Sequence, residues 1–502
     1  MPIIGSTPPT GDSGAKERQS PWRDLRLKDL SFGFASADFE AAQDPDLLLR
    51  GFVDPFKLVD EARAGKRWLF LGYKGSGKSA LGEHLRLVSA SDPHLFVQTV
   101  NIADVSFATF SQILKGQIEP TARYPTVWSW LLLLFLFDSF SKDQAANCTR
   151  DAELYLVIES LKELGLLPEP TLKEAVSRTA DSGFTLKLTA YGAGLEVTSK
   201  KSDAPADLPF FVERLRMLVR RIETENRHLL IIDGFDDLLR EGKLQYDALG
   251  ALIYETNRLN MEFAKADLPA KIVVLCRTDL FERLPSANKN KIRQNAAVHI
   301  DWTCDRRNPK SSHLVILINH RAGLTNKDLD VFDTFLPEYL GTHGGDIRTQ
   351  VLDHTRYVPR DIVMLFNKLQ DHSGDGRMTK NQVDNALTAY SRDYLLPEIK
   401  DELEGYVDGD DIKSIFQILG AARRISPSRT DLEHHAKNLH VRGEFDLDGV
   451  LGVMYECSAI GNLLNRRTGY STFKHRDRHT SFNQDEPIIV HEGLWKALNL
   501  KW

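Results

Sequence analysis

Residues 71–80 read LGYKGSGKSA and directly follow the apolar run RWLF at residues 67–70. Within eight of these residues stand three glycines, two lysines and two serines. Such a run is either a flexible surface turn or a loop shaped to wrap an anion. Gly72, Gly77, Lys78 and Ser79 match the spacing G-x-x-x-x-G-K-[ST], which is typical of a phosphate-binding loop between a strand and a helix.

The spacing has a specific physical basis. Gly75 and Gly77 allow the backbone to curl, so that successive N–H groups point inward at phosphate oxygens. A helix that begins near Lys78 adds the positive end of its dipole. Lys78 can reach the β- and γ-phosphates, and the Ser79 hydroxyl can bind Mg²⁺. Ordinary amino-acid usage gives this match by chance in roughly 1% of chains of this length. We therefore predict that ATP and Mg²⁺ bind here, with the nucleotide held by Gly72, Gly75, Ser76, Gly77, Lys78, Ser79 and Ala80.

Five short β-rich runs alternate with helical stretches and predict a parallel sheet covered by helices. They are RWLFLG from residue 67, LFVQTVNI from 95, HLLIID from 228, KIVVLC from 271 and AVHIDW from 297. The expected fold class is α/β, with a three-layer P-loop NTPase core, a helical lid and a C-terminal winged-helix domain. Residues 118–208 contain a Trp/Leu-rich helix and a predicted hairpin at 184–199, and they are interpreted as an insertion.

A bound triphosphate also needs a carboxylate that holds the metal, usually at the end of a neighbouring apolar strand. The run HLLIIDGFDDLL provides Asp233 after four apolar residues. An ordinary acidic turn after a strand would look the same, but the two motifs together are more specific than either alone. We predict that Asp233 and Ser79 hold Mg²⁺.

With both motifs in hand, the sequence resembles the P-loop ATPases of the AAA+/STAND type. Many AAA+ members carry a water-orienting glutamate directly after the metal aspartate, and Gly234 stands there in this chain. The run Asp-Gly-Phe-Asp-Asp looks like the Walker B motif of NACHT-type STAND proteins. That resemblance implies Asp236 or Asp237 as the water-activating acid, unless both are surface acids that cap the next helix.

The resemblance also implies three catalytic arginines, each of which has a plain structural alternative. Arg277, at the tip of the fourth strand, would sense the γ-phosphate, since a guanidinium is permanently charged and can bind two oxygens. Arg293 stands where AAA+ rings place an arginine finger toward a neighbouring subunit. Pro359 and Arg360 resemble the lid segment with a sensor arginine. Residues 48–55, LLRGFVDP, lie where such ATPases surround the adenine.

Composition sets the remaining bounds. The 502 residues allow two to four domains, and a net charge of −6 excludes nucleic-acid binding by bulk charge. The four cysteines form no CxxC pair, and the first 21 residues lack a signal peptide's apolar core. The apolar run at 127–137 is too short to cross a bilayer. We expect a cytoplasmic protein that binds no membrane.

The predicted boundaries are a disordered tail (1–24), the ATPase core (25–305), the helical lid (306–400) and the winged-helix domain (401–502). In the last unit we expect helices at 411–422, 429–439 and 446–460, a basic hairpin between 461 and 480, and a final helix at 491–500. This layout resembles that of origin-recognition-like ATPases and of bacterial ATPases encoded beside defence genes.

The basic hairpin suggests contact with double-stranded DNA through Arg466, Arg467, Lys474 and Arg476, interleaved with Tyr470 and Phe473. A solvated or protein-docking hairpin is the alternative. The leading interpretation is a slow, Mg-ATP-driven switch that controls this domain in DNA binding or in a phage-defence or DNA-maintenance complex, within a homo- or hetero-oligomer. The alternative is a nucleotide-stabilised scaffold that recruits a protein effector with little turnover and no DNA. A small-molecule kinase would leave the lid and the C-terminal unit unexplained.

Overall fold

The computed structural model describes residues 25–115, 119–180, 207–235, 243–285, 288–303, 308–324, 328–340, 345–438, 446–465, 467 and 469–501. The expected disordered tail, the hairpin at 184–199, Asp236, Asp237 and Arg466 lie outside these residues.

The five predicted strands are confirmed, and they form one parallel sheet in the order β2-β3-β4-β1-β5. Their bounds are β1 (Leu69–Gly72), β2 (Leu95–Asn101), β3 (Arg227–Asp233), β4 (Ala270–Arg277) and β5 (Ala297–Ile300). In β4, Ile272 and Val274 contribute to the core on one face of the sheet, and Val273 and Leu275 contribute to the core on the other. This alternation explains the continuous apolar runs, because a parallel sheet is covered on both faces. The fold is that of an α/β P-loop NTPase.

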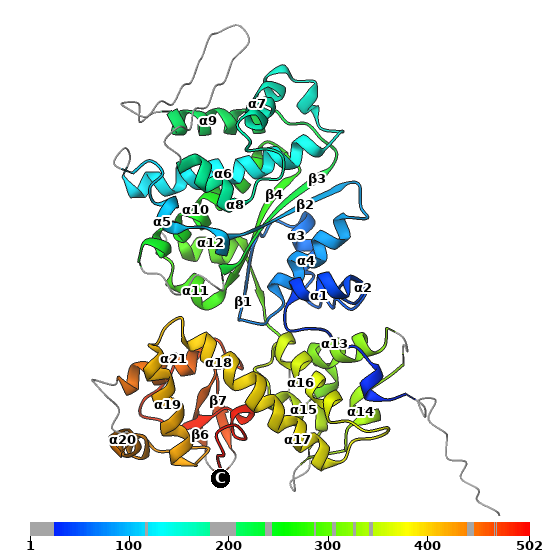
Figure 1. Cartoon of the computed structure of the whole chain (residues 1–502), viewed down its shortest axis with the longest axis vertical. Coiled ribbons are helices and arrows are strands. Elements are labelled where there is room, and N and C mark those ends of the chain that lie inside the picture. Colours follow the sequence, from blue (N-terminus) through cyan, green and yellow to red (C-terminus); the bar gives the residue numbers. More distant parts are fainter. Residues whose placement is uncertain are drawn as a thin grey trace, which may run out of the picture.

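Figure 1 shows helices on both faces of this sheet. Helix α4 packs beside β1 and β2 together with the amino-terminal helices, while α6 and α10 cover the opposite face. The helices of the core are α1 (Ala37–Gln43), α2 (Pro45–Arg50), α3 (Leu58–Ala64), α4 (Lys78–Ser89), α10 (Lys243–Lys265), α11 (Thr278–Arg283) and α12 (Lys289–Ala296).

The segment between β2 and β3 is helical where it is described, with α5 (Phe107–Phe110), α6 (Pro120–Lys142), α7 (Ala152–Glu163), α8 (Leu172–Ala180) and α9 (Asp207–Val219). The Trp/Leu-rich helix is α6, and it is buried as expected, with Trp128 and Trp130 each 1% exposed or less. Because α6 shares its core with α10 and the sheet, it is part of the covering layer rather than an appendage. In the described part of the chain no helix is both long and apolar enough to span a bilayer.

Beneath the sheet in Figure 1 lies the lid, which we define as α13 to α18. Its helices are α13 (His313–Ala322), α14 (Val331–Phe335), α15 (Ile347–Asp353), α16 (Pro359–Asp371), α17 (Lys380–Tyr390) and α18 (Leu396–Leu403). A π-helical segment, Ser391–Leu395, joins α17 to α18 without a break. Insertions of this kind occur often at functional sites. The expected boundary at residue 400 falls inside α18, which ends at Leu403.

The C-terminal unit, which we define as everything after α18, lies beside the lid (Figure 1). It contains the three predicted helices, α19 (Gly409–Ala422), α20 (Arg429–Asn438) and α21 (Leu447–Glu456). A three-stranded antiparallel sheet of β6 (Ile460–Asn465), β7 (Tyr470–Thr472) and β8 (Ile488–Val490) follows them. The predicted hairpin is therefore present as β6 and β7.

The prediction of a last helix at 491–500 is wrong. Only a single 3₁₀ turn forms there, at Glu492–Leu494, and turns follow it. The side chain of Trp495 reaches back instead, and its indole N–H donates to the carbonyl of Val490 over 2.7 Å. The Ala497 N–H also donates to the hydroxyl of Ser391, 106 positions earlier, over 3.0 Å, so long-range contacts outweigh the local helical preference here.

Candidate nucleotide-binding site

The glycine loop connects β1 to α4, as the motif requires. Gly75 and Gly77 have φ values of +79° and +92°, in the left-handed region that favours glycine. A Cβ atom built on Gly77 would meet no atom within 4 Å, so this part of the loop faces open space. The Ser76 hydroxyl is buried and has no hydrogen-bond partner among the described residues. A buried hydroxyl without a partner, next to a curved stretch of backbone that faces open space, is an arrangement that a phosphate group would fit.

Lys78 is the first residue of α4 and is 5% exposed. Its ammonium donates to the carbonyls of Gly72 and Tyr73, over 3.1 and 3.0 Å. The Lys78 side chain is thus folded back onto the carbonyls of its own loop. A phosphate would offer it stronger, charge-assisted hydrogen bonds than these neutral carbonyls.

Two contacts from outside fix the shape of the loop. The Trp302 indole, just beyond β5, donates to the Ser76 carbonyl over 2.9 Å. The backbone N–H of Arg360, at the start of α16 in the lid, donates to the Gly75 carbonyl over 3.2 Å. The loop is therefore held by the core on one side and by the lid on the other.

A cavity of about 100 Å³ lies against this loop. Besides the loop, it is lined by Phe34, Phe52, Val53, Leu58, Trp302, Leu317, Arg321, Pro359, Arg360 and Val363, among others. Residues 52 and 53 belong to the stretch expected around the adenine. The cavity is smaller than pockets that bury a drug-sized ligand, which measure roughly 300–1,000 Å³. In this conformation the cavity is too small for a whole nucleotide.

Asp233 ends β3, but the expectation that β3 neighbours the loop strand is wrong. Strand β4 lies between β1 and β3, and the register sets Gly72 opposite Arg277 and Ile232 opposite Val274. Asp233 is therefore separated from the loop strand by β4. Its carboxylate accepts the backbone N–H of Gly234 over 2.8 Å.

Gly234 cannot be replaced by a larger residue without a change in the surrounding structure. Its φ is +88°, and a Cβ atom built there would stand 1.7 Å from the amide oxygen of Asn101 at the end of β2. A glutamate after Asp233, as in many AAA+ proteins, would therefore require a strained φ and a shift of the Asn101 side chain.

Magnesium fits this site as an ion bound mainly through the nucleotide. In the residues that the structure describes, no group of three or more His, Cys, Asp or Glu side chains could hold a metal alone. Mg²⁺ in such sites typically keeps several waters and binds one or two protein groups plus phosphates. Ser79 and Asp233 stay the predicted ligands, and Mg²⁺ held by them would neutralise negative charge on the phosphates.

Arg277 lies at the tip of β4, as expected, and is 2% exposed. Its guanidinium binds both oxygens of Asp279, over 3.0 and 2.7 Å, and one oxygen of Glu402 on α18, over 3.2 Å. Burial alone would raise the pKa of Asp279, but the charge and hydrogen bonds of Arg277 hold that pKa down at about 2. In this structure the predicted sensor is therefore engaged with carboxylates, one of which comes from the lid.

A second carboxylate of α18 engages two more cations of the site. Glu398 lies 3.1 Å from the ammonium of Lys74 in the glycine loop and 3.0 Å from the guanidinium of Arg360. Burial would raise the pKa of Glu398, but Lys74, Arg356 and Arg360 together lower it. Glu402 likewise binds Arg356, just before α16, over 2.7 Å. We refer to Glu398 and Glu402 as the α18 carboxylates.

Arg293 lies on α12 at the molecular surface and binds Glu282 on α11 over 2.6 Å. It is one-third exposed and can reach solvent. The contact of an arginine finger with a second subunit stays a prediction. So does the role of Asp236 or Asp237, which lie outside the described residues.

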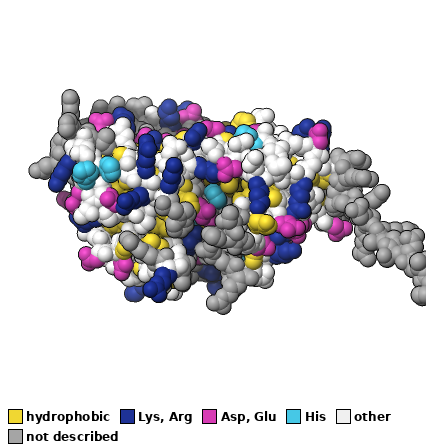
Figure 2. All heavy atoms as spheres, turned by 90° about the horizontal axis from the view of Figure 1, so that it is seen from below, with side chains coloured by type: hydrophobic (Ala, Val, Ile, Leu, Met, Phe, Trp, Pro, Cys, Tyr) yellow, Lys and Arg dark blue, Asp and Glu magenta, His cyan; other side chains and the backbone are white. Residues whose placement is uncertain are grey.

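Most described cations of the basic hairpin point into the molecule. Lys474 donates to the Thr480 carbonyl over 2.9 Å, and Arg476 binds Asp353 of α15 over 3.1 Å. Arg478 binds Asp301, just after β5. Arg467 is exposed. Figure 2, which views the end formed by the lid and the C-terminal unit, shows basic and acidic side chains interspersed rather than a basic stripe.

Sequence reasoning identified the loop and its cations but missed their carboxylate partners. Glu398 and Glu402 are four residues apart, so they lie on one face of α18. That spacing is common on any solvated helix, and no motif marks it. Trp302 and Lys74 were also missed, although Lys74 stands inside the glycine loop itself.

Comparison with known proteins yields one distant relative and a weak structural likeness. No protein-family model matches the chain. The chain is 22% identical to the putative transposon gamma-delta 80.3 kDa protein of Escherichia coli K12, over 92% of its own length. It spans 66% of that relative, slightly less than two thirds. The crystal structure of Cdc6p from Pyrobaculum aerophilum aligns with 91% of this chain and 97% of its own, at 12% identity and a TM-score of 0.31.

Proposed function

We propose that this protein is an ATP-driven molecular switch that binds Mg-ATP between core and lid and hydrolyses it slowly. The observation that carries the proposal is the engagement of the site's cations by the α18 carboxylates. Glu398 holds Lys74 and Arg360, and Glu402 holds Arg277. A triphosphate at the glycine loop would compete with these carboxylates for the same positive charges, since both are anions of similar hydrogen-bonding geometry.

This competition supplies the difference between two states that a switch requires. A ligand shifts a conformational equilibrium only by its differential affinity for the two states. With ATP bound, the cations would turn to phosphate oxygens and α18 would lose its hold on the core. After hydrolysis, fewer phosphate oxygens remain, and the carboxylates would recover their cations. Lys78, Arg277 and Arg360 are the groups proposed to sense the γ-phosphate.

The lid and the C-terminal unit would move together. His491 of the C-terminal unit is buried and lies 3.2 Å from the Thr355 carbonyl, and the Ala497 N–H donates to Ser391 over 3.0 Å. Residues of both units belong to one apolar cluster, which also extends into the ATPase core through residues such as Leu81 and Val273. The contacts between this pair and the ATPase core also include polar ones, Arg277 with Glu402 and Arg478 with Asp301. These polar contacts are the ones that a bound triphosphate would change.

We further propose that the output of the switch is exposure of the C-terminal unit, which has the helix and strand order of a winged helix. Arg476 and Arg478 contact the lid and the core, so release of these contacts would free them for phosphate binding. A hollow of about 590 Å³ beside Tyr470, which is 61% exposed, adds a surface for a partner. The distant relative is named for a transposon, which supports a DNA-related output over a role in phage defence.

A second candidate is a nucleotide-stabilised scaffold with negligible turnover and no DNA binding. The residue after Asp233 favours it, because Gly234 supplies no water-activating carboxylate there. In that case Asp236 and Asp237 would be surface acids.

ATP turnover with and without double-stranded DNA tests the proposal. The switch predicts measurable hydrolysis that is lost in Lys78→Ala and in Asp236→Asn, with ATP binding retained only in Asp236→Asn. It also predicts that DNA changes the rate. Tight ATP binding with no hydrolysis in any condition would favour the scaffold, and no ATP binding at all would refute both.

A further inference from the structure

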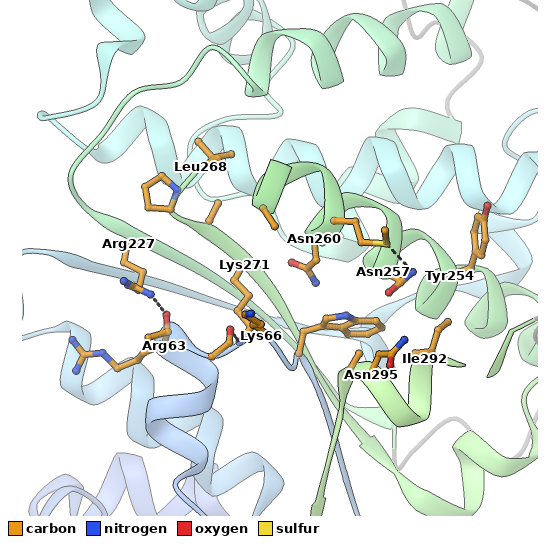
Figure 3. Close-up of a pocket in the computed structure, with 18 of the residues that line it drawn as sticks. Arg63, Lys66, Arg227, Tyr254, Asn257, Asn260, Leu268, Lys271, Ile292 and Asn295 are labelled. Atoms are coloured by element: carbon orange, nitrogen blue, oxygen red, sulfur yellow. Dashed lines mark hydrogen bonds between the residues drawn. The ribbon is translucent and has the colours of Figure 1, made fainter. Parts of the chain in front are cut away.

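A second, larger cavity lies at the opposite edge of the sheet from the glycine loop (Figure 3). Its volume is about 660 Å³, within the range of small-molecule sites. Trp68, Arg227 and Lys271, which line it, stand at the amino ends of β1, β3 and β4. The glycine loop follows the carboxyl end of β1, so the two cavities are separate.

Several cationic side chains line this cavity, and none of the described lining residues is acidic. Among the described residues, the lining includes Arg63, Lys66, Arg227, Lys271 and Lys291 and no Asp or Glu. Arg63 binds Asp92, which lies outside the wall, over 2.9 Å. Lys66 and Lys291 are exposed and have no hydrogen-bond or ion-pair partner in the described part of the chain. A bound anion would fit this arrangement of cations best.

Lys271 is a further lining cation that a bound anion would stabilise. Its ammonium donates to the carbonyls of Glu61 and Gly65, over 2.6 and 3.0 Å. Burial, together with the charges of Arg227 and Arg67, lowers its pKa to about 8, although Glu61 opposes that shift. A bound anion nearby would stabilise its charged form.

The rest of the wall is apolar, aromatic and amide-bearing. Figure 3 shows Arg63, Lys66, Arg227 and Lys271 toward one side of the cavity and Tyr254, Ile292 and Asn295 toward the other. Tyr254 is 44% exposed. Asn257 and Asn295 add side-chain amides, which can both donate and accept hydrogen bonds. Four of the five described lining cations thus lie toward one side of the cavity, and the fifth, Lys291, is on α12.

We propose that this cavity binds a small organic anion, with a phosphate or carboxylate group at the cationic side and a flat aromatic body between α10 and α12. Nucleoside phosphates and aromatic acids share this chemistry. A single cavity of ligand size favours a small molecule over a polymer, which would need a continuous basic track. The inference does not depend on ATP binding at the glycine loop.

The test is a calorimetric titration of the full chain with 1-naphthyl phosphate, 1-naphthoate and inorganic phosphate. The two naphthyl probes share a body and differ in the anionic group, so they distinguish a phosphate ligand from a carboxylate ligand. We expect saturable binding of at least one naphthyl probe and much weaker binding of inorganic phosphate.

The double variant Lys66→Gln/Arg227→Gln should weaken that binding about tenfold or more, because two charge-assisted contacts at the cationic side are lost. Both side chains are exposed, so the fold should survive, which a thermal melt would confirm. Lys265→Gln, which removes an exposed charge at the end of α10 outside the cavity wall, is the matched control and should leave the affinity unchanged.

Tyr254→Ala should weaken naphthyl binding while leaving any residual phosphate binding unaltered. The proposal is overturned if no naphthyl probe binds at millimolar concentration, or if inorganic phosphate binds as tightly as naphthyl phosphate. It is equally overturned if the cavity variants bind like the wild type, or if binding is confined to a long oligonucleotide.

Discussion

Replacing Glu398 by Gln should make this protein bind ATP more tightly, which is an unusual expectation for a substitution beside a binding site. In the structure Glu398 holds Lys74 and Arg360 in two partly buried ion pairs, with side chains 15%, 17% and 27% exposed. ATP would have to displace this carboxylate from both cations. Glutamine keeps the shape of the side chain and removes its charge.

The magnitude follows from the two pairs. An ion pair at this degree of exposure contributes about 1 kcal/mol or less, since solvent still screens it. Removal of both therefore lowers the free energy of ATP binding by about 1–2 kcal/mol, which is about a 5- to 30-fold tighter dissociation constant. ADP should gain less than ATP if Lys74 and Arg360 meet the γ-phosphate.

Titration calorimetry with ATP and ADP measures both effects. Asp401→Asn is the matched control, because it removes the same charge from the exposed face of the same helix. Asp401→Asn should leave both affinities unchanged. If Glu398→Gln weakens ATP binding or leaves it unaltered, the carboxylate does not compete with phosphate. If both variants tighten binding equally, the effect is one of bulk charge and the reasoning fails.

Three further predictions concern the core, the pH response and the C-terminal unit. Gly234→Ala should destabilise the protein by at least about 1–2 kcal/mol in chemical denaturation, because alanine resists a φ of +88° and meets Asn101; an unchanged midpoint would contradict this. His228 is buried between Ser139 and Asp143, and burial lowers its pKa to about 4. Below about pH 6.5, His228 therefore binds a proton in the unfolded chain, whereas in the folded chain it does so only near pH 4. Stability should therefore fall as pH drops from about 6.5 to 4, and His228→Phe should reduce the slope by up to about 1.4 kcal/mol per pH unit, whereas an identical slope would exclude His228 as its source. Arg467→Glu should weaken any DNA binding without loss of thermal stability. Arg476→Glu should lower the melting temperature, because it breaks the contact with Asp353. If Arg467→Glu lowers the melting temperature and Arg476→Glu does not, Arg476 is the free cation of the two.

Much of the fold could be predicted because its determinants are local. The glycine spacing requires a strand before it and a helix after it, and β1 and α4 are there. Apolar runs of four to eight residues marked the five strands, since strands buried on both faces carry few polar residues. The prediction of a helix at 491–500 failed for the converse reason, because contacts with distant residues, such as that of Ala497 with Ser391, hold that segment.

The site was only partly predictable because its partners come from different parts of the chain. Arg277 was named as a sensor from its place at a strand end, yet its contact with Glu402 joins residues 125 positions apart. Strand order is also invisible to a local motif, so Asp233 was expected beside β1, although β4 intervenes. The hairpin arginines illustrate the same limit, since a count of basic residues does not reveal that Arg476 and Arg478 bind acids of the lid and the core.

The cationic loop at residues 72–79 is the point on which the account depends, and a titration with Mg-ATP tests it most directly. Wild-type protein should bind one nucleotide per chain, with affinity that falls when Mg²⁺ is withdrawn. Lys78→Ala should abolish that binding while its circular dichroism spectrum stays that of the wild type. A folded Lys78→Ala protein that binds Mg-ATP as tightly as the wild type would contradict the assignment of this loop as the nucleotide site.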